Sequence, residues 1–323
     1  MRQSRIVSVG AYRPAREVGN DEVCALIDST DEWVRRRSGI TSRRYASADE
    51  TVVTMGEEAA RIALSRAGLD VSEVDTVILA TMSHLHQSPA AAPQIASRLG
   101  TKCAAFDISA ACAGFCHALG VADALVRGGC AEHVLVVGSE KMTDIIDPLD
   151  RTTAFLFGDG AGAAVVSPSD VRGIGPVEWS SDGGNHHLIE HSSSWLDLRD
   201  KPDAEWPTMR MSGQEVFRWA TQHVPEAAAA ALAKAGVRAD ELAALVPHQA
   251  NLRIVETIAS KLGLPPHVAV ARDVVTAGNT SSASIPLALD ALLSSGEVAP
   301  GGSALLVGFG AGLAVASQVV TLP

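Results

Sequence analysis

Residues 104–119 read AAFDISAACAGFCHAL, an apolar segment that gives way to small residues and then to a helix-forming sequence. The pattern predicts a strand over residues 105–108 and an apolar helix that begins near Cys112 and runs to about Val126. A cysteine at a helix start lies beside unpaired backbone N–H groups and the positive end of the helix dipole, which favour the thiolate. Cys112 is therefore a candidate nucleophile, although a small buried cysteine is the commoner explanation for such a residue.

The composition of the chain bounds its fold class and its partners. Hydrophobic residues make up 47% of the 323 residues and aromatic residues only 4%, which is typical of helices packed closely on a buried sheet. The net charge of −11 argues against nucleic acid or an anionic membrane as the main partner. Five cysteines without a small-scaffold pattern, and no apolar run that could span a bilayer, predict a soluble cytoplasmic α/β protein with reduced thiols.

Several blocks of sequence recur in the same order in the two parts of the chain. The segments ALSRAGL, IASRLG, VLVVG and GAG are matched by ALAKAGV, IASKLG, ALLVG and GAG, which begin at residues 63, 95, 134 and 160 and at residues 231, 258, 304 and 310. An alanine-rich composition does not produce four matches in one order by chance. The repeats therefore indicate an internal duplication with halves at residues 1–170 and 171–323.

The duplication brings two further residues to the candidate site. Residues 276–282, TAGNTSS, occupy the place in the second half that the Cys112 turn occupies in the first, so Cys112 and Asn279 are expected to begin equivalent helices. His248 follows the second-half strand, at the edge where parallel sheets bind ligands. Singly, His248 could be a buried strand-end histidine and Asn279 a helix cap. Together with Cys112 they favour a catalytic site.

Three motifs carry a family resemblance. The segments DISAACAGF, PHQANLR and GNTSSAS, at residues 107–115, 247–253 and 278–284, resemble the catalytic motifs of β-ketoacyl-acyl-carrier-protein synthase III. The resemblance extends from about Val7 to the C-terminus. It implies the thiolase fold, with two duplicated α/β halves in a layered αβαβα arrangement, and a homodimer. The chain also resembles related enzymes that prime bacterial aromatic polyketide pathways, and its sequence does not separate the two groups.

The resemblance also implies a reaction. Cys112 would attack an acyl-CoA primer and form an acyl-enzyme, with the backbone N–H groups of Cys112 and Ala311 as the oxyanion hole. Malonyl-acyl carrier protein would then lose CO2, and His248 and Asn279 would donate hydrogen bonds to the resulting enolate. The product is a 3-ketoacyl carrier protein that starts fatty acid or polyketide synthesis. No metal, nucleotide or redox cofactor is expected.

Substrate-binding residues are predicted from matching positions in the same family. Trp33, Arg37 and Arg151 would contact CoA, and Asn251 the pantetheine arm. Three further basic residues form a candidate docking patch for an acidic carrier protein, although solvated surface charges explain each of them equally well: Arg218, Arg253 and Lys261.

The acyl pocket is where the chain departs from the straight-chain bacterial enzymes of this family. Those enzymes usually carry a phenylalanine where this chain has Ser88. In the resembling fold this loop reaches across the dimer to line the partner's pocket. A serine at this position predicts a wider pocket, unless Leu85 or Met142 fills the space.

Other functions remain as alternatives at this stage. The same fold could serve as a non-condensing subunit that selects a starter, or as an acyltransferase that passes the acyl group of Cys112 to an alcohol or amine. Cys116 lies one turn after Cys112 and is expected to pack in the core, because no further metal ligands accompany the pair. The polar segment 180–207, which contains His186, His187 and His191, is expected to be a mobile loop. No dinucleotide or serine hydrolase motif is present.

Overall fold

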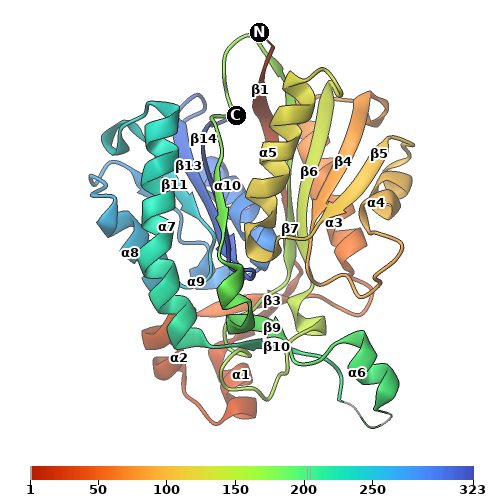
Figure 1. Ribbon diagram of the computed structural model, residues 1–323, viewed down its shortest axis with the longest axis vertical. Coiled ribbons are helices and arrows are strands. Elements are labelled where there is room, and N and C mark those ends of the chain that lie inside the picture. The colour runs from red at the N-terminus through yellow and green to blue at the C-terminus, as the bar shows by residue number, and fades with distance from the viewer. Residues whose placement is uncertain (1, 202, 204) are drawn as a thin grey trace.

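Two five-stranded sheets with the same strand order form the centre of the computed structural model, which describes residues 2–201, 203 and 205–323 (Figure 1). The first sheet has the order β1-β7-β6-β4-β5, with bounds Gln3–Tyr12, Gly160–Ser169, His133–Glu140, Val74–Ala80 and Ala104–Ile108. The second has the matching order β8-β14-β13-β11-β12, with bounds Glu178–Ser181, Ala314–Thr321, Ser303–Gly310, Ala244–Pro247 and Ala269–Val270. In each sheet three neighbouring strands are parallel, the fourth pairs antiparallel with the third, and the last strand pairs antiparallel with the fourth.

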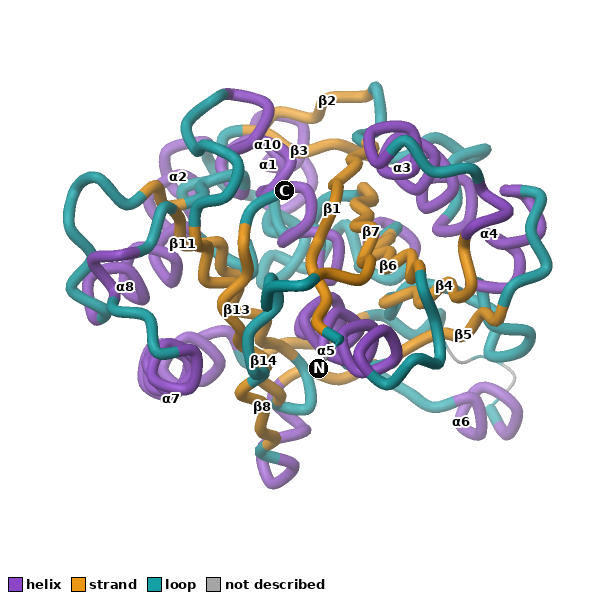
Figure 2. Tube along the Cα trace, turned by 90° about the horizontal axis from the view of Figure 1, so that it is seen from above, coloured by secondary structure: helices purple, strands orange, loops and turns teal. Residues whose placement is uncertain are grey.

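Helices cover both sheets in layers (Figures 1 and 2). One outer layer is α3 (Val52–Ala67) and α4 (Ala92–Leu99), and the other is α7 (Gly213–Ala235) and α8 (Leu252–Lys261). Between the sheets lie α5 (Gly114–Arg127) and α10 (Ser284–Ser295), whose apolar residues share one core with strands of both sheets. The structure therefore has the αβαβα layers that the sequence predicts. The residues before and after position 170 build different sheets. The predicted boundary between the halves, at residues 170 and 171, stays a prediction.

Shorter elements gather at one end of the layers, shown at the bottom of Figure 1. They pack around a separate apolar cluster that includes Val34, Met142 and Phe155. Two two-stranded sheets belong to this region, β2 (Arg16–Gly19) with β3 (Ser42–Tyr45) and β9 (Ile189–His191) with β10 (Met209–Met211). Its helices are α1 (Asn20–Ile27), α2 (Asp31–Ser38), α6 (Trp195–Asp200) and α9 (Val274–Ala277). The segment expected to be a mobile loop, residues 180–207, therefore contains β9 and α6.

The repeated sequence blocks occupy matching places in the two halves. Helices α3 and α7 both end at a glycine in the left-handed conformation, Gly68 and Gly236, where a side chain would be strained. Each middle helix follows a short 3-10 turn, Ala111–Ala113 before α5 and Ser281–Ala283 before α10.

One predicted equivalence is corrected by these turns. Both begin with a residue at positive φ, Ala111 at 43° and Ser281 at 48°, so the counterpart of Cys112 is Ser282. Asn279 lies three residues earlier, before the turn. The predicted pairing of Asn279 with Cys112 is wrong because the second half has additional residues before its turn. These residues place Asn279 alongside Phe157 before the turn begins.

Within residues 2–201, 203 and 205–323, no helix combines the length and the apolar character that crossing a bilayer requires.

Candidate active site

Cys112 lies on the turn between β5 and α5, with backbone packed closely around it. Gly310, at the end of β13, is so near that a Cβ added there would lie 2.7 Å from Cys112 Cβ and 3.2 Å from its sulfur. A Cβ on Gly114 would lie 2.9 Å from Ala80 Cβ. Gly310 is therefore required by the approach of β13 to Cys112, and Gly114 by the approach of α5 to the end of β4.

Burial, together with a smaller contribution from the nearby Glu140 carboxyl group, raises the pKa of the Cys112 thiol to about 12. The Ser281 side chain and the backbone N–H of Cys112 act in the opposite direction. Cys112 keeps some accessible surface, but protein atoms surround its sulfur. The expectation that its place at a helix start favours the thiolate is therefore wrong for the net shift, because desolvation outweighs the nearby donors.

His248 follows β11 directly and is 2% exposed. Its backbone N–H donates to Val307 O at 2.8 Å, and its ring lies edge-on to Phe309 with the centroids 5.1 Å apart. Nδ1 lies 2.7 Å from Ser284 Oγ, which also accepts a hydrogen bond from the Gln249 N–H. This pattern suits a Ser284 hydroxyl that donates to Nδ1, so that the ring proton lies on Nε2. Burial lowers the pKa of His248 to about 3 and keeps the ring neutral.

Asn279 is held in place by its backbone and its own turn. It is 6% exposed; its N–H donates to Leu156 O at 2.8 Å and its carbonyl accepts from the Gly158 N–H at 3.0 Å. Its Oδ1 accepts from the Ser281 N–H at 2.8 Å. The group that Asn279 can offer a substrate is therefore the Nδ2 donor.

Contacts through neighbouring residues bring the three predicted side chains to one place. Gly310 touches Cys112, and the residue before it, Phe309, packs on His248. The Ser281 N–H donates to Asn279 Oδ1, and the turn Ser281–Ala283 contacts the turn Ala111–Ala113 that carries Cys112. These contacts link a thiol to two neutral N–H donors through shared neighbours, a set of groups that suits a nucleophile and a site for a negatively charged oxygen.

Glu140, at the end of β6, is a buried acid beneath this site that the sequence analysis did not single out. Its carboxylate accepts from Ser83 Oγ at 2.5 Å, from Thr81 Oγ1 at 3.1 Å and from the Met82 N–H at 3.1 Å. It also lies 2.7 Å from Ser282 Oγ in the second half. Burial raises the pKa of Glu140. The feature of the sequence that could have identified Glu140 is a charged residue at the end of an apolar strand, VLVVGSE.

The predicted CoA-binding residues also lie together. The Arg151 guanidinium is 5.0 Å and the Arg37 guanidinium 6.0 Å from the centre of the Trp33 ring, and both arginines are exposed. Asn251 begins α8, where its Oδ1 accepts from the Arg253 N–H at 2.9 Å and its Nδ2 donates to Arg37 O at 3.2 Å. Asn251 therefore has a structural role as a helix cap, and its pantetheine contact stays a prediction.

The three basic residues of the predicted docking patch lie along the packed helices α7 and α8, and all are exposed. The Arg253 guanidinium covers the Phe217 ring at 4.9 Å, beside Arg218. Lys261 Nζ donates to Thr221 O at 2.8 Å. The structure thus gathers their charge on one surface.

The residues of the predicted acyl pocket lie apart within this chain. Ser88 is exposed on the loop between β4 and α4, and Leu85 is 40% exposed. Met142 is fully buried in the apolar cluster of the end region. Ser88 is not among the residues that line the cavity of about 170 Å³ described below, so its place in an acyl pocket stays a prediction.

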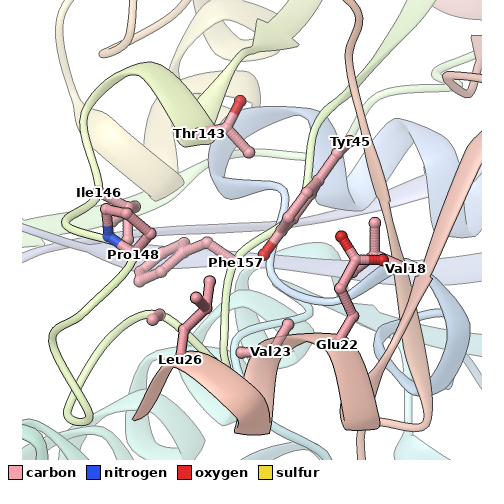
Figure 3. A pocket seen from close by; sticks show the side chains of 10 residues that line it. Val18, Glu22, Val23, Leu26, Tyr45, Thr143, Ile146, Pro148 and Phe157 are labelled. Atoms are coloured by element: carbon pink, nitrogen blue, oxygen red, sulfur yellow. The ribbon is translucent and has the colours of Figure 1, made fainter.

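One cavity was not predicted. It has a volume of about 170 Å³ and lies between α1, the paired strands β2 and β3, and residues 143–157 (Figure 3). Apolar side chains from both sides, including Val23, Leu26 and Phe157, point into it. The backbone of Phe157 pairs with Asn279, so one wall of the cavity adjoins the site.

No cluster of three or more histidine, cysteine or acidic residues that could hold a metal ion occurs in residues 2–201, 203 and 205–323. His186 and His187 contact each other edge-on. Cys116 is fully buried in the central core.

Two family profiles match the chain. 3-Oxoacyl-[acyl-carrier-protein] synthase III matches residues 106–183, and its C-terminal counterpart matches residues 232–322. The chain is 53% identical to a β-ketoacyl-[acyl-carrier-protein] synthase III of Streptomyces lividans, over all of this chain and 95% of that protein. The chain belongs to the β-ketoacyl-acyl-carrier-protein synthase III family. The family resemblance stated from the sequence motifs is thereby confirmed, and the chain is an enzyme of the acyltransferase class.

Solved structures of this synthase III family agree with the fold. The priming β-ketosynthase of a polyketide biosynthetic pathway matches with a TM-score of 0.98 at 53% identity, covering all of this chain and 97% of that one. The 3-oxoacyl-(acyl carrier protein) synthase III of Pseudomonas aeruginosa matches with a TM-score of 0.91 at 35% identity, covering 99% and 98%. The predicted thiolase fold is confirmed.

Proposed function

We propose that this enzyme condenses an acyl-CoA primer with malonyl-acyl carrier protein, through an acyl-Cys112 intermediate, to give 3-ketoacyl-acyl carrier protein. The observation that supports the proposal is that contacts through Phe309, Gly310 and Ser281 link Cys112, His248 and Asn279 in a chain of this family. The reaction starts a fatty acid or a polyketide chain, and the similarity to a priming β-ketosynthase of a polyketide pathway supports the second of these roles.

The side chains divide the reaction between them. The Cys112 thiolate attacks the thioester carbon, and the backbone N–H groups of Cys112 and Ala311 hold the oxyanion until CoA leaves. The close contact between Gly310 and Cys112 supports this placement, because Ala311 is the next residue in the chain after Gly310. Malonyl carrier protein then loses CO2, and the enolate oxygen receives hydrogen bonds from His248 Nε2 and Asn279 Nδ2. The carbanion attacks the acyl carbon and releases the Cys112 sulfur.

The substrates bind on surfaces around this centre. Trp33, Arg37 and Arg151 form an aromatic and cationic cluster that suits the adenine ring and phosphates of CoA, and Asn251 adjoins it for the pantetheine arm. The patch of Arg218, Arg253 and Lys261 suits an acidic carrier protein, because its positive charge stands on a protein of net charge −11.

The enzyme works as a homodimer in this proposal. Strand β5 lies at the edge of its sheet and its Phe106 is 38% exposed, so its backbone is available to a second copy. A dimer through this edge would also give the exposed Ser88 loop a partner surface. A cytoplasmic location stays a prediction.

Acylation of Cys112 tests the proposed function. After incubation with acetyl-CoA or isobutyryl-CoA, peptide mass mapping should find the acyl mass on Cys112, and addition of malonyl-acyl carrier protein should remove it as ketoacyl carrier protein. Acylation at Cys116 or Cys103 would refute the assignment. Transfer to an alcohol or amine in place of malonyl carrier protein would identify the acyltransferase alternative, and absence of acylation the starter-selecting one.

Primer choice is expected to depend on Ser88. A pocket without the usual phenylalanine ring holds extra methyl groups, and each buried CH2 contributes about 0.8 kcal/mol. Branched and four- to five-carbon primers should therefore be used at least as well as acetyl-CoA. Ser88→Phe should shift kcat/KM toward acetyl-CoA by roughly tenfold relative to isobutyryl-CoA, with malonyl carrier use unchanged.

The control for this prediction is Gln87→Phe, which adds the same ring to the adjacent exposed residue. It should leave primer choice as in the wild type. A wild-type enzyme strongly selective for acetyl-CoA would mean that another side chain fills the space, and would contradict the pocket assignment.

A further inference from the structure

Asn279 takes its position from a neighbouring segment of the first half of the chain. Its N–H donates to Leu156 O at 2.8 Å and its carbonyl oxygen accepts from the Gly158 N–H at 3.0 Å, so the two segments run side by side. The side chain adds one hydrogen bond, which Oδ1 accepts from the Ser281 N–H at 2.8 Å. The Nδ2 donor of Asn279 therefore points where this backbone pairing and this turn direct it.

Strand β3 holds both ends of the segment that pairs with Asn279. At one end, Arg43 Nη2 donates to Phe155 O at 2.7 Å. At the other end, the Asp159 N–H donates to Arg44 O at 2.8 Å. The residues that bond the Asn279 backbone lie between these two contacts, so their position depends on β3.

Arg43 also packs against both of the backbones that meet at Asn279. A Cβ added to Gly158 would lie 3.1 Å from Arg43 Cβ, and a Cβ added to Gly278 would lie at the same distance from it. Gly158 bonds the Asn279 carbonyl oxygen, and Gly278 is the residue before Asn279. The Arg43 side chain therefore begins beside the two segments and reaches along one of them to Phe155 O.

Arg43 is a fully buried cation whose guanidinium bonds no acidic side chain in the described part of the chain. It is 0% exposed, its hydrogen bonds go to Phe155 O at 2.7 Å and to Val18 O at 3.4 Å, and its Nε has no partner there. Burying a guanidinium without a carboxylate is costly in free energy, whereas an apolar side chain of similar size would fill the space without that cost. Packing alone therefore does not account for an arginine at this position.

We propose that Arg43 is a positioning residue for Asn279 in the condensation step. Its guanidinium holds Phe155 O and so fixes the segment to which the Asn279 backbone is hydrogen-bonded. Without this contact the segment would shift, and Nδ2 would no longer be aligned with the enolate oxygen. A displacement of about 1 Å at a reacting group can cost on the order of a hundredfold in rate. This inference rests on the proposed function, in which Asn279 acts on malonyl carrier protein and not on the acyl-CoA.

The first test compares the two half-reactions in Arg43→Met and Arg43→Lys. Arg43→Met keeps a long side chain without donors, and its condensation rate should fall by about tenfold to a hundredfold. Acylation of Cys112 by acetyl-CoA should stay within about twofold of the wild type, because the contact acts on Asn279. Arg43→Lys keeps one donor for Phe155 O and should lie between the wild type and Arg43→Met. Release of labelled CO2 and intact-protein mass spectrometry measure the two steps.

A double-mutant cycle separates positioning from a general loss of structure. If Arg43 acts through Asn279, Arg43→Met should lower condensation little further in an Asn279→Ala background. If Arg43→Met does not fold, Arg43→Lys takes its place in the cycle. The matched control is Arg44→Met, which removes the next side chain of β3, whose guanidinium pairs with Glu17. It should match the wild type in both steps.

Hydrogen exchange tests the contact without substrate. Peptides that cover residues 155–159 and 278–282 should exchange about tenfold faster in Arg43→Lys than in the wild type or in Arg44→Met. Unchanged exchange in these peptides would overturn the inference. An equal loss of condensation in the wild-type and Asn279→Ala backgrounds, or a loss of acylation in step with condensation, would overturn it as well while leaving the proposed function intact. Normal condensation in Asn279→Ala alone would instead refute the proposed enolate site, and this inference with it.

Discussion

Alanine at His248 or at Asn279 should leave acylation of Cys112 measurable while reducing condensation by on the order of a hundredfold or more. The reason is the placement of their donors. With Nδ1 of His248 against Ser284 and Oδ1 of Asn279 against Ser281, the free donors are Nε2 and Nδ2, which suit the enolate oxygen of malonyl carrier protein. Intact-protein mass spectrometry measures the acyl-enzyme, and release of labelled CO2 measures the second half-reaction.

A pH profile adds a further check on His248. Because burial lowers its pKa to about 3, the ring stays neutral above that pH and loses its neutral form only as the pH falls through it. Condensation should therefore show no inflection near pH 6.5, where an exposed histidine titrates.

The matched control is His267→Ala, which removes an exposed histidine that contacts the Asp240 backbone. It should leave both half-reactions unchanged. Normal condensation in His248→Ala or Asn279→Ala would mean that the enolate site is assigned wrongly. Loss of acylation in step with condensation would place the residue in the first half-reaction as well.

Gly310→Ala should reduce formation of acyl-Cys112 by on the order of a hundredfold, although the change adds a single methyl group. That methyl carbon would lie 2.7 Å from Cys112 Cβ and 3.0 Å from its backbone nitrogen, which forces the nucleophile or the glycine turn to move. A displacement of about 1 Å at a reacting group can cost this much in rate. The same crowding should cost about 1–3 kcal/mol of stability. Single-turnover acylation and thermal unfolding measure the two effects.

Gly19→Ala is the control for this variant. Gly19 has an extended backbone with φ at −79°, and no atom lies within 4 Å of an added Cβ. It should keep full acylation activity. If Gly310→Ala were acylated at the wild-type rate, the atoms around Cys112 would accommodate the added methyl group without loss of activity. That result would contradict the proposed oxyanion hole beside Gly310.

Local sequence patterns were enough to predict the framework. The strand predicted over residues 105–108 is β5, Ala104–Ile108, and the helix predicted to run to about Val126 is α5, Gly114–Arg127. Helices α3 and α4 end at Gly68 and Gly100, because a left-handed C-terminal residue favours glycine. The repeated blocks predicted duplicated halves because equal sequences fold into equal units. The same argument brought His248 to a strand end beside the Cys112 turn.

The chemistry of the site was decided by tertiary contacts that no local pattern contains. The sequence placed Cys112 at a helix start and predicted an easily formed thiolate, yet burial between two halves raises its pKa. Glu140 ends an ordinary apolar strand, and only the folded chain brings Thr81, Ser83 and Ser282 to its carboxylate. Asn279 was paired by motif with Cys112, but its chain first runs alongside Phe157, so that Ser282 is the true counterpart. Desolvation and hydrogen bonding depend on which distant segments meet, whereas strand and helix patterns depend on neighbours in the chain.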